Sequence, residues 1–203
     1  MDEFLPVNQT PAPSAPEPQK ESVFKKYLAL GWEIIKILVI AAIIVLPIRY
    51  FLFQPFIVKG DSMVPNFHSG DYLIVDEISY RLSSPQRGDV VVFRYPLDPS
   101  QRFIKRVLGL PGETVDVKNG KVTVTKNGKT MAIEESYLPK ALATDGTAHV
   151  TLAEGNYFVM GDNRPFSYDS RRWGVLPEKD IIGKAFLRIF PLSTISYMAR
   201  PSY

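Results

Sequence analysis

Ser62, in the segment Gly60–Val64, is a serine in a setting that could make it a nucleophile. The segment begins like the G-x-S-x-G turn of α/β hydrolases, but it lacks the second glycine and the α/β alternation of that fold. A Ser-His-Asp triad would have to use His68 or His149, the two histidines of the chain. Both lie in polar, turn-like segments, so we expect solvated loop histidines rather than a catalytic base.

Lys105 offers an alternative base, because it lies in the β-branched and aromatic run Phe103–Leu108. Alternate side chains of a strand share a face, which places Lys105 between Phe103 and Val107. Burial beside apolar groups disfavours the ammonium form and lowers the pKa of lysine from ~10.4 toward neutrality. From the pattern alone, an ordinary exposed strand lysine remains the alternative.

A third region that could support chemistry is the loop Gly161–Gly174, which is rich in turn formers and in paired opposite charges. This composition predicts either a rigid hydrogen-bonded loop after a strand or a salt-bridged surface loop. Asp162 and Asp169 lack the spacing of a Ca²⁺ loop. The chain has no cysteine, which excludes disulfides, Cys-bound zinc, iron–sulfur clusters and thiol nucleophiles. We expect no metal site.

The elements that must position these residues are mainly β-strands. Asn119-Gly120 and Asn127-Gly128 are typical of tight hairpin turns, and short β-branched or aromatic runs predict the strands. These are Tyr72–Val75, Val90–Phe93, Phe103–Leu108, Thr114–Lys118, Lys121–Thr125, Tyr157–Met160 and Ile181–Phe190. We predict one mainly β domain over residues 54–203.

Two different segments precede this domain. Residues 1–22 hold five of the 17 prolines among polar residues, which predicts a disordered tail. Ile34–Phe53 is apolar except for Lys36 and Arg49, and as a helix it would rise ~30 Å, enough to cross a bilayer. A buried core helix and a cleaved signal peptide are the alternatives, but no small-x-small cleavage site follows. We predict a retained membrane anchor within residues 23–53.

Charge on the two sides of this anchor predicts its orientation. Lys20, Lys25 and Lys26 precede it, whereas Lys59 is the one lysine among residues 54–73. Because positive charge is enriched on the cytoplasmic side, we expect a cytoplasmic N-terminus and an extracytoplasmic domain. The net charge of +3 is too small to indicate a nucleic-acid partner.

Several segments, in order along the chain, together resemble the type I signal peptidases of the branch that uses a lysine. They are Ser62–Pro65, Arg87–Val91, Lys105–Val107 with Gly109–Glu113, and Gly161–Arg164 with Ser167, Asp169, Ser170 and Arg171. The resemblance covers roughly residues 34–190 and is closest to compact members with one anchor. It implies a signal-peptidase/LexA-like β fold and a membrane-anchored serine endopeptidase. Its substrates would be exported preproteins, cleaved after small residues of the Ala-x-Ala type.

By this resemblance, Ser62 is the nucleophile and Lys105 the general base of an acyl-enzyme mechanism. Ser167 would orient Lys105 through a hydrogen bond, and Asp169 with Arg171 would hold the loop as an ion pair. The resemblance implies no cofactor and no metal. The implied partners are secretory preproteins and the lipid bilayer, with the protein-export translocon nearby.

The remaining implied roles concern the turn around Ser62, where the chain also departs from the family pattern. Met63 and Pro65 would shape this turn. Asn66 stands where the family usually has threonine, and Gly60 stands where some members have a serine that stabilises the oxyanion. The oxyanion hole would therefore rest on backbone N–H groups at Ser62 and around the Gly60 position.

Two rival hypotheses come from other classes of protein. A self-cleaving Ser/Lys peptidase of the LexA-like group would carry a DNA-binding module, which the sequence lacks. A non-catalytic, membrane-tethered β module would not require both Ser62 and Lys105, and the sequence retains both.

Overall fold

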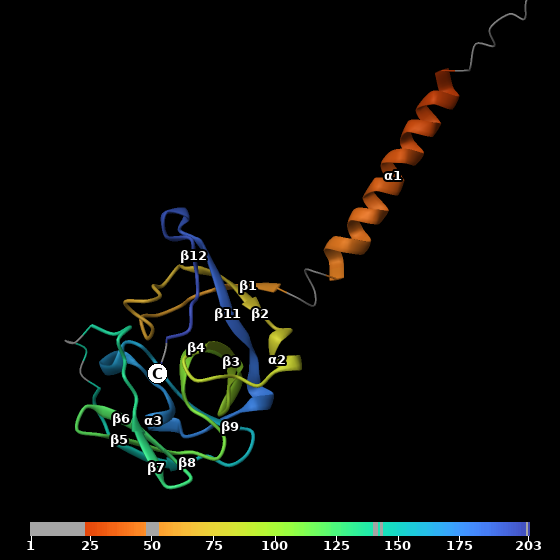
Figure 1. Ribbon diagram of the computed structural model, residues 1–203. Coiled ribbons are helices and arrows are strands. Elements are labelled where there is room, and N and C mark those ends of the chain that lie inside the picture. The colour runs from red at the N-terminus through yellow and green to blue at the C-terminus, as the bar shows by residue number, and fades with distance from the viewer. Residues whose placement is uncertain (1–22, 48–52, 140–141, 143, 202) are drawn as a thin grey trace, which may run out of the picture. The chain divides into compact units, whose positions relative to one another are not determined.

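The computed structural model describes residues 23–47, 53–139, 142, 144–201 and 203. The chain divides into two units, one ending at Ile44 and the other beginning at Val45. A single helix forms the described part of the first unit, and all of the described strands belong to the second (Figure 1). The predicted tail, residues 1–22, lies outside the described residues.

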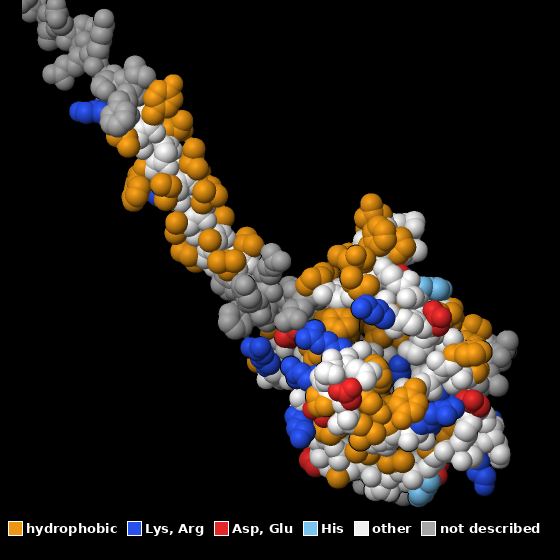
Figure 2. All heavy atoms as spheres, turned by 180° about the vertical axis from the view of Figure 1, so that it is seen from behind, with side chains coloured by type: hydrophobic (Ala, Val, Ile, Leu, Met, Phe, Trp, Pro, Cys, Tyr) orange, Lys and Arg blue, Asp and Glu red, His pale blue; other side chains and the backbone are white. Residues whose placement is uncertain are grey.

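Helix α1 spans Val23–Pro47 and confirms the prediction of an apolar N-terminal helix. Within it, Lys25–Leu46 is a stretch of 22 residues with a mean hydropathy of 2.4, long enough at ~1.5 Å per residue to cross a bilayer. Exposed hydrophobic side chains follow one another along the helix from Tyr27 to Leu46, and they cover much of the face that Figure 2 shows. The predicted helix, Ile34–Phe53, extended too far at its C-terminal end, because Phe53 is the first residue of strand β1.

The second unit is built on a large antiparallel sheet with the strand order β1-β2-β11-β3-β4-β9-β10, and β12 pairs with β11. Its strands are β1 (Phe53–Ile57), β2 (Tyr72–Asp76), β3 (Val90–Tyr95), β4 (Asp98–Gly109), β9 (Asn156–Met160), β10 (Leu176–Pro177), β11 (Ile181–Phe190) and β12 (Ser196–Tyr197). In the described part of the chain, β1 is an edge strand that pairs with β2 alone. Strand β4, which carries Lys105, lies between β3 and β9.

A smaller antiparallel sheet has the order β7-β6-β5-β8. Its strands are β5 (Thr114–Lys118), β6 (Lys121–Lys126), β7 (Lys129–Ala132) and β8 (Ala148–Thr151). Asn119 and Asn127 both have a φ of 52° and are followed by glycines with a φ of 75°, as the predicted hairpin turns require. The loop prediction for His149 is wrong: it lies in β8, with Nδ1 2.5 Å from Asp116 Oδ1 on the neighbouring strand.

Short helices connect several strands. They are α2 (Ser79–Leu82), η2 (Arg164–Phe166), α3 (Ser170–Trp173), η3 (Glu178–Asp180) and η4 (Leu192–Thr194).

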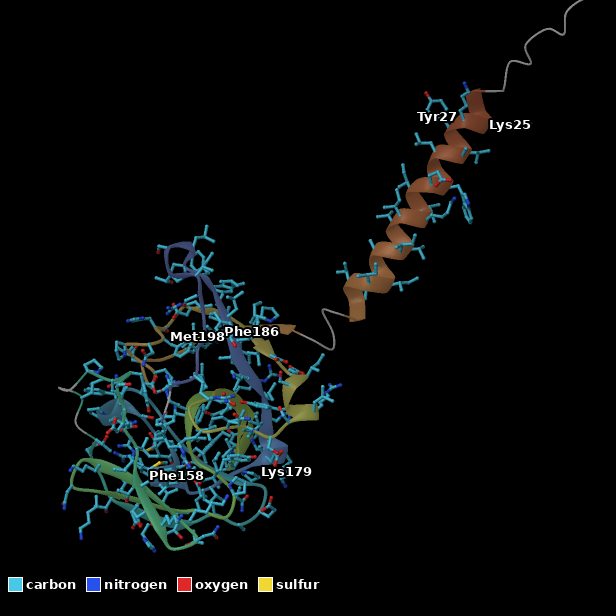
Figure 3. All side chains as sticks on the ribbon, viewed as in Figure 1. Lys25, Tyr27, Phe158, Lys179, Phe186 and Met198 are labelled. Carbon is cyan, nitrogen blue, oxygen red and sulfur yellow. The ribbon has the colours of Figure 1, made fainter. Side chains whose placement is uncertain are left out.

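Three apolar clusters hold the second unit together and confirm the mainly β prediction. One packs Met63 and Phe67, from the turn after β1, against the large sheet. A second joins β4 and β9 to the smaller sheet and contains the fully buried Phe158 (Figure 3). The third includes Val91 and Val107, which lie on the face of the large sheet that Lys105 shares.

Candidate active site

A cleft of about 670 Å³ lies between β1 and β4. One wall is formed by residues 55–62, from β1 and the turn that follows it, and the other by Ser100 and residues 102–105 of β4. The exposed rings of Phe166 and Tyr168 complete the lining. Both Ser62 and Lys105 lie in this lining.

Ser62 and Lys105 meet although they are 43 positions apart in the sequence. A hydrogen bond of 2.6 Å joins Lys105 Nζ and Ser62 Oγ. Lys105 is 4% exposed and lies directly opposite Val91 of β3, in line with Phe103 opposite Phe93. The predicted strand face, with Lys105 between Phe103 and Val107, is therefore the observed one.

The surroundings of Lys105 favour its neutral form. Burial lowers the pKa of Lys105 from 10.5 to about 8, because the ammonium loses hydration that apolar neighbours do not replace. The carboxylates of Asp169 and Asp162 act in the opposite direction, and Arg171 adds a smaller lowering effect. A lysine that is neutral near physiological pH can accept a proton, which an ordinary lysine cannot.

The turn after β1 presents Ser62 at the end of the cleft. Met63 and Phe67 are buried in the core on either side of the exposed Pro65, and the Phe67 N–H donates to the Met63 carbonyl at 2.9 Å. The Gly60 N–H donates to Ser69 Oγ at 3.3 Å. The Ser62 N–H donates to no acceptor among the described residues.

The loop Gly161–Arg164 holds this turn from the other side. The Asn163 N–H donates to the Ser62 carbonyl at 3.0 Å, and its side-chain amide donates to the Asp61 carbonyl at 2.9 Å. Gly161 is packed so closely that a Cβ there would overlap the Ser167 hydroxyl and the Ser62 carbonyl oxygen. The backbone on both sides of the Ser62 side chain is thus clamped.

Ser167, Asp169 and Arg171 gather next to this clamp. The Arg171 guanidinium donates two hydrogen bonds of 2.8 Å to the Asp169 carboxylate, and the Gly161 N–H donates to the same carboxylate at 3.0 Å. Although burial opposes it, these contacts lower the pKa of Asp169. The Ser167 hydroxyl contributes to this lowering, yet it has no partner with hydrogen-bond geometry in the described part of the chain. Lys105 Nζ, for its part, is hydrogen-bonded to Ser62 rather than to Ser167.

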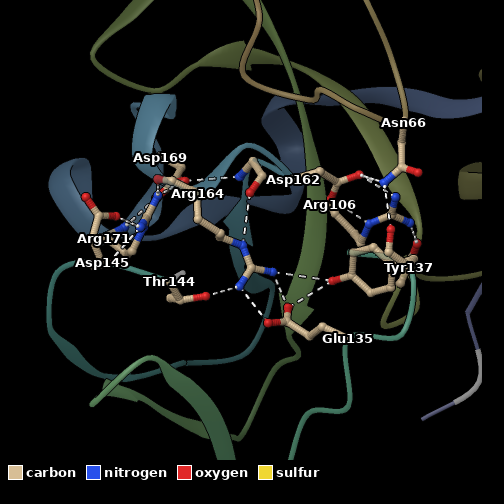
Figure 4. Close-up of polar contacts among 12 residues, drawn as sticks. Asn66, Arg106, Glu135, Tyr137, Thr144, Asp145, Asp162, Arg164, Asp169 and Arg171 are labelled. Atoms are coloured by element: carbon tan, nitrogen blue, oxygen red, sulfur yellow. Dashed lines mark hydrogen bonds and ion pairs between the residues drawn. The ribbon is translucent and has the colours of Figure 1, made fainter. Parts of the chain in front are cut away.

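A second buried ion pair lies on the other face of β4 (Figure 4). Arg106 binds Asp162 with bonds of 2.9 and 2.6 Å and lies over the ring of Tyr137, 4.2 Å from its centroid. Arg164 binds Glu135 with Nη1 at 2.6 Å and with Nη2. Arg106 is the neighbour of Lys105 on β4, and Arg164 belongs to the loop beside Ser62. Both are thus bound to the segment that precedes β8.

Comparisons with known proteins identify the family of this chain and several relatives. A family model described as signal peptidase, peptidase S26, matches residues 31–190. A probable signal peptidase I-1 of Synechocystis sp. is 40% identical over 173 residues, which cover 80% of this chain and 86% of that protein. A signal peptidase I of Leptolyngbya laminosa is 36% identical, over 97% of this chain and 95% of that one. A crystal structure of a signal peptidase I from Enterococcus faecalis is 31% identical and covers 50% of this chain and 97% of its own, with a TM-score of 0.43.

The fold and the matched relatives define a serine peptidase. The chain belongs to the signal peptidase family, peptidase S26, and its relatives are signal peptidases I. The resemblance found in the sequence is therefore confirmed, and so are the fold class and the assignment as a hydrolase.

Sequence reasoning missed the partners that hold the site. Arg106 was noted only as part of a family segment, Asp162 only as part of such a segment and as a rejected metal ligand, and nothing marked Glu135 or Tyr137. The available signal was the position of Arg106 on a strand whose residues alternate between two apolar faces, because a charge buried there requires a partner.

Proposed function

We propose that this protein is a membrane-anchored serine endopeptidase that removes signal peptides from exported preproteins, with Ser62 as the nucleophile and Lys105 as the general base. The observation that carries the proposal is the 2.6 Å contact between Ser62 Oγ and a lysine amine that is 4% exposed. Burial provides the neutral amine, and the short distance lets it take the serine proton.

The reaction follows from these two side chains. The neutral Lys105 amine takes the proton of Ser62 while Oγ attacks the scissile carbonyl, and the Ser62 N–H stabilises the oxyanion that forms. Lys105 then gives the proton to the leaving amine, which departs with the mature protein and leaves the signal peptide as an ester on Ser62. Water, deprotonated by Lys105, hydrolyses this ester and restores both side chains.

The other predicted site residues support this pair. Met63 anchors the turn in the core and Pro65 follows in its exposed part. Asp169 and Arg171 form a buried ion pair that braces the loop. Ser167, whose hydroxyl lies close to Gly161, would orient the Lys105 amine. The second oxyanion donor would come from the backbone around Gly60 or from water.

The cleft suits an extended peptide. Its two walls are the edge strand β1 and the first half of β4, so a substrate can lie along β1 as an added strand and direct alternate side chains into the cleft. Phe56, Val58 and Ile104 supply apolar lining there. Small residues before the scissile bond, of the Ala-x-Ala type, would fit such a space.

We further propose that residues 1–22 are a cytoplasmic tail, that residues 23–53 contain the bilayer-spanning helix and that the catalytic domain, residues 54–203, is extracytoplasmic. Lys20, which precedes α1, and Lys25 and Lys26 in its first turn support this orientation. The domain would then meet preproteins at the membrane, near the translocon. Protease added to spheroplasts should digest this domain, whereas complete protection of it with digestion of the N-terminal tail would reverse the orientation.

The direct test is cleavage of a preprotein by the detergent-solubilised full chain, followed by sequencing of the new N-terminus. The expected cut follows an Ala-x-Ala segment. Ser62→Ala should abolish it, whereas Ser83→Ala, directly after α2 and outside the lining of the cleft, should not. Cleavage by the Ser62→Ala variant at the wild-type rate would exclude Ser62 as the nucleophile.

A further inference from the structure

Asn66 is tied by its side chain to the buried ion pair beneath the site. Its amide Nδ2 donates to Asp162 Oδ2 at 2.8 Å and lies 3.4 Å from the Tyr137 carbonyl oxygen (Figure 4). Asp162 is fully buried, and both of its oxygens accept from Arg106. A half-buried side chain of the turn after β1 is thus attached to a rigid charged pair.

These contacts close a ring through the candidate active site. Asn66 belongs to the turn that carries Ser62, and Arg106 is the neighbour of Lys105 on β4. The ring runs from Ser62 along the turn to Asn66, whose side chain binds Asp162. Asp162 binds Arg106, which is next to Lys105 on β4. The 2.6 Å contact between Lys105 and Ser62 completes the ring. Asn163 gives the Ser62 backbone a second link to the same ion pair, because its N–H and side-chain amide hold the Ser62 and Asp61 carbonyls and Asp162 directly precedes it in the chain. The Asn66 amide supplies the link at the far end of the turn.

We propose that Asn66 is a positioning residue, whose side-chain amide sets the distance between Ser62 Oγ and Lys105 Nζ by joining their two elements through Asp162 and Arg106. The inference rests on the proposed function. It gives a role to the position at which this chain departs from the threonine usual in the family.

The fold of the turn does not depend on this amide. Arg188 of β11 donates to the Asn66 carbonyl at 3.1 Å and to Asp71 at 3.0 Å. Met63 and Phe67 anchor the turn in the core on either side. A substitution that removes only the amide donor therefore leaves the turn folded, and removes one of its two links to the Asp162–Arg106 pair.

The connection also bears on the protonation of Lys105. The charged groups that face this amine are Asp169, Asp162 and Arg171, and burial opposes its charged form. When the Ser62 turn moves away from β4, water enters beside the amine and its pKa rises toward the ordinary value. Loss of the Asn66 amide should therefore change the pH dependence as well as the rate.

The test compares Asn66→Leu, which keeps the approximate shape but has no donor, with Asn66→Asp, which places a second carboxylate against Asp162. Asn156→Ala is the matched control, because Asn156 is also half-buried but lies in β9, outside the ring. Preprotein cleavage by the full chain in detergent gives kcat and KM from pH 6 to 10, and thermal unfolding reports the folded fraction.

For Asn66→Leu we expect kcat to fall by about 10- to 100-fold, as for a misplacement of ~1 Å, with KM within about twofold. The rising limb should move to higher pH by at least ~0.5 unit, and Asn66→Asp should lose more. A kcat within about threefold of wild type at every pH would overturn the proposal, as would a loss equal to the loss of folded protein with an unchanged pH profile. Absence of cleavage by wild type and Asn156→Ala would instead refute the proposed function itself.

Discussion

The pH dependence of cleavage gives the strictest test of Lys105 as the base. With a pKa of about 8, about one amine in ten is neutral at pH 7, against about 0.03% for a lysine that titrates at its ordinary value. The lowered pKa, whose main cause is burial, should thus give a roughly 300-fold larger active fraction at neutral pH. The expected profile of kcat/KM rises about tenfold per pH unit below pH 8 and levels off above it.

The matching perturbation is Lys105→Arg. Guanidinium stays protonated at any working pH, so the variant keeps the charge but cannot accept the serine proton. Its kcat should fall by about 10²–10⁴, the usual cost of losing a general base. Lys184→Arg is the control, because Lys184 is a partly buried lysine paired with Asp89 outside the cleft.

The assay is cleavage of a preprotein or a quenched Ala-x-Ala peptide by the full chain in detergent, in overlapping buffers from pH 5.5 to 10.5. A rising limb centred near 10.5, the ordinary lysine value, would refute the argument from burial. Cleavage by Lys105→Arg within tenfold of the wild-type rate would refute the role of the lysine itself.

Three further predictions follow from the packing of the site. Lys105→Met should abolish cleavage yet stabilise the protein by up to about 3 kcal/mol at pH 7. Because the pKa of Lys105 in the folded protein is lowered to about 8, this gain in stability should be full below pH 8 and disappear as the pH rises to 10.5. Urea unfolding of both proteins at pH 7 and 10.5 measures the gain. An equal gain at both pH values would contradict the prediction. Gly161→Ala should reduce kcat about 10²-fold, since its Cβ overlaps Ser167 and the Ser62 carbonyl, whereas Gly31→Ala, with open space in α1, should not. His68→Ala and His149→Ala should each retain most of the activity, because one lies in an exposed turn and the other pairs with Asp116 in the smaller sheet; a loss of 10²-fold in a folded variant would restore the triad hypothesis.

The strands that the sequence predicted are β-branched or aromatic runs such as Val90–Phe93, or segments that flank an Asn-Gly hairpin turn. Thr114–Lys118 and Lys121–Lys126 flank Asn119-Gly120, and local sterics alone determine that turn. Strand β1 was missed because Pro55 argues against a strand and the apolar helix precedes it closely. Strand β8 was missed because its residues, Ala148–Thr151, form an edge with little apolar surface.

The site was predictable in its residues but not in its geometry. Alternation along β4 gave the apolar face of Lys105, a local property. The approach of Ser62 to Lys105 depends on the pairing of β1 with β2 and of β3 with β4, which no spacing encodes. It also depends on Glu135 and Tyr137, in a segment without periodicity whose role appears only when Arg106 and Arg164 are buried against it.

The open edge of β1 exposes the protein to self-association. An edge strand with free backbone groups accepts an extended chain of another molecule as readily as a substrate, and two copies could join their sheets edge to edge. Pro55, in the middle of β1, has no N–H to donate, so a partner strand that ran the whole length of this edge would lose a hydrogen bond there. A short peptide that pairs only with the residues after Pro55, toward Ser62, would lose no hydrogen bond. Pro55 therefore weakens edge-to-edge pairing of two sheets but leaves the part of the edge next to Ser62 available to a substrate.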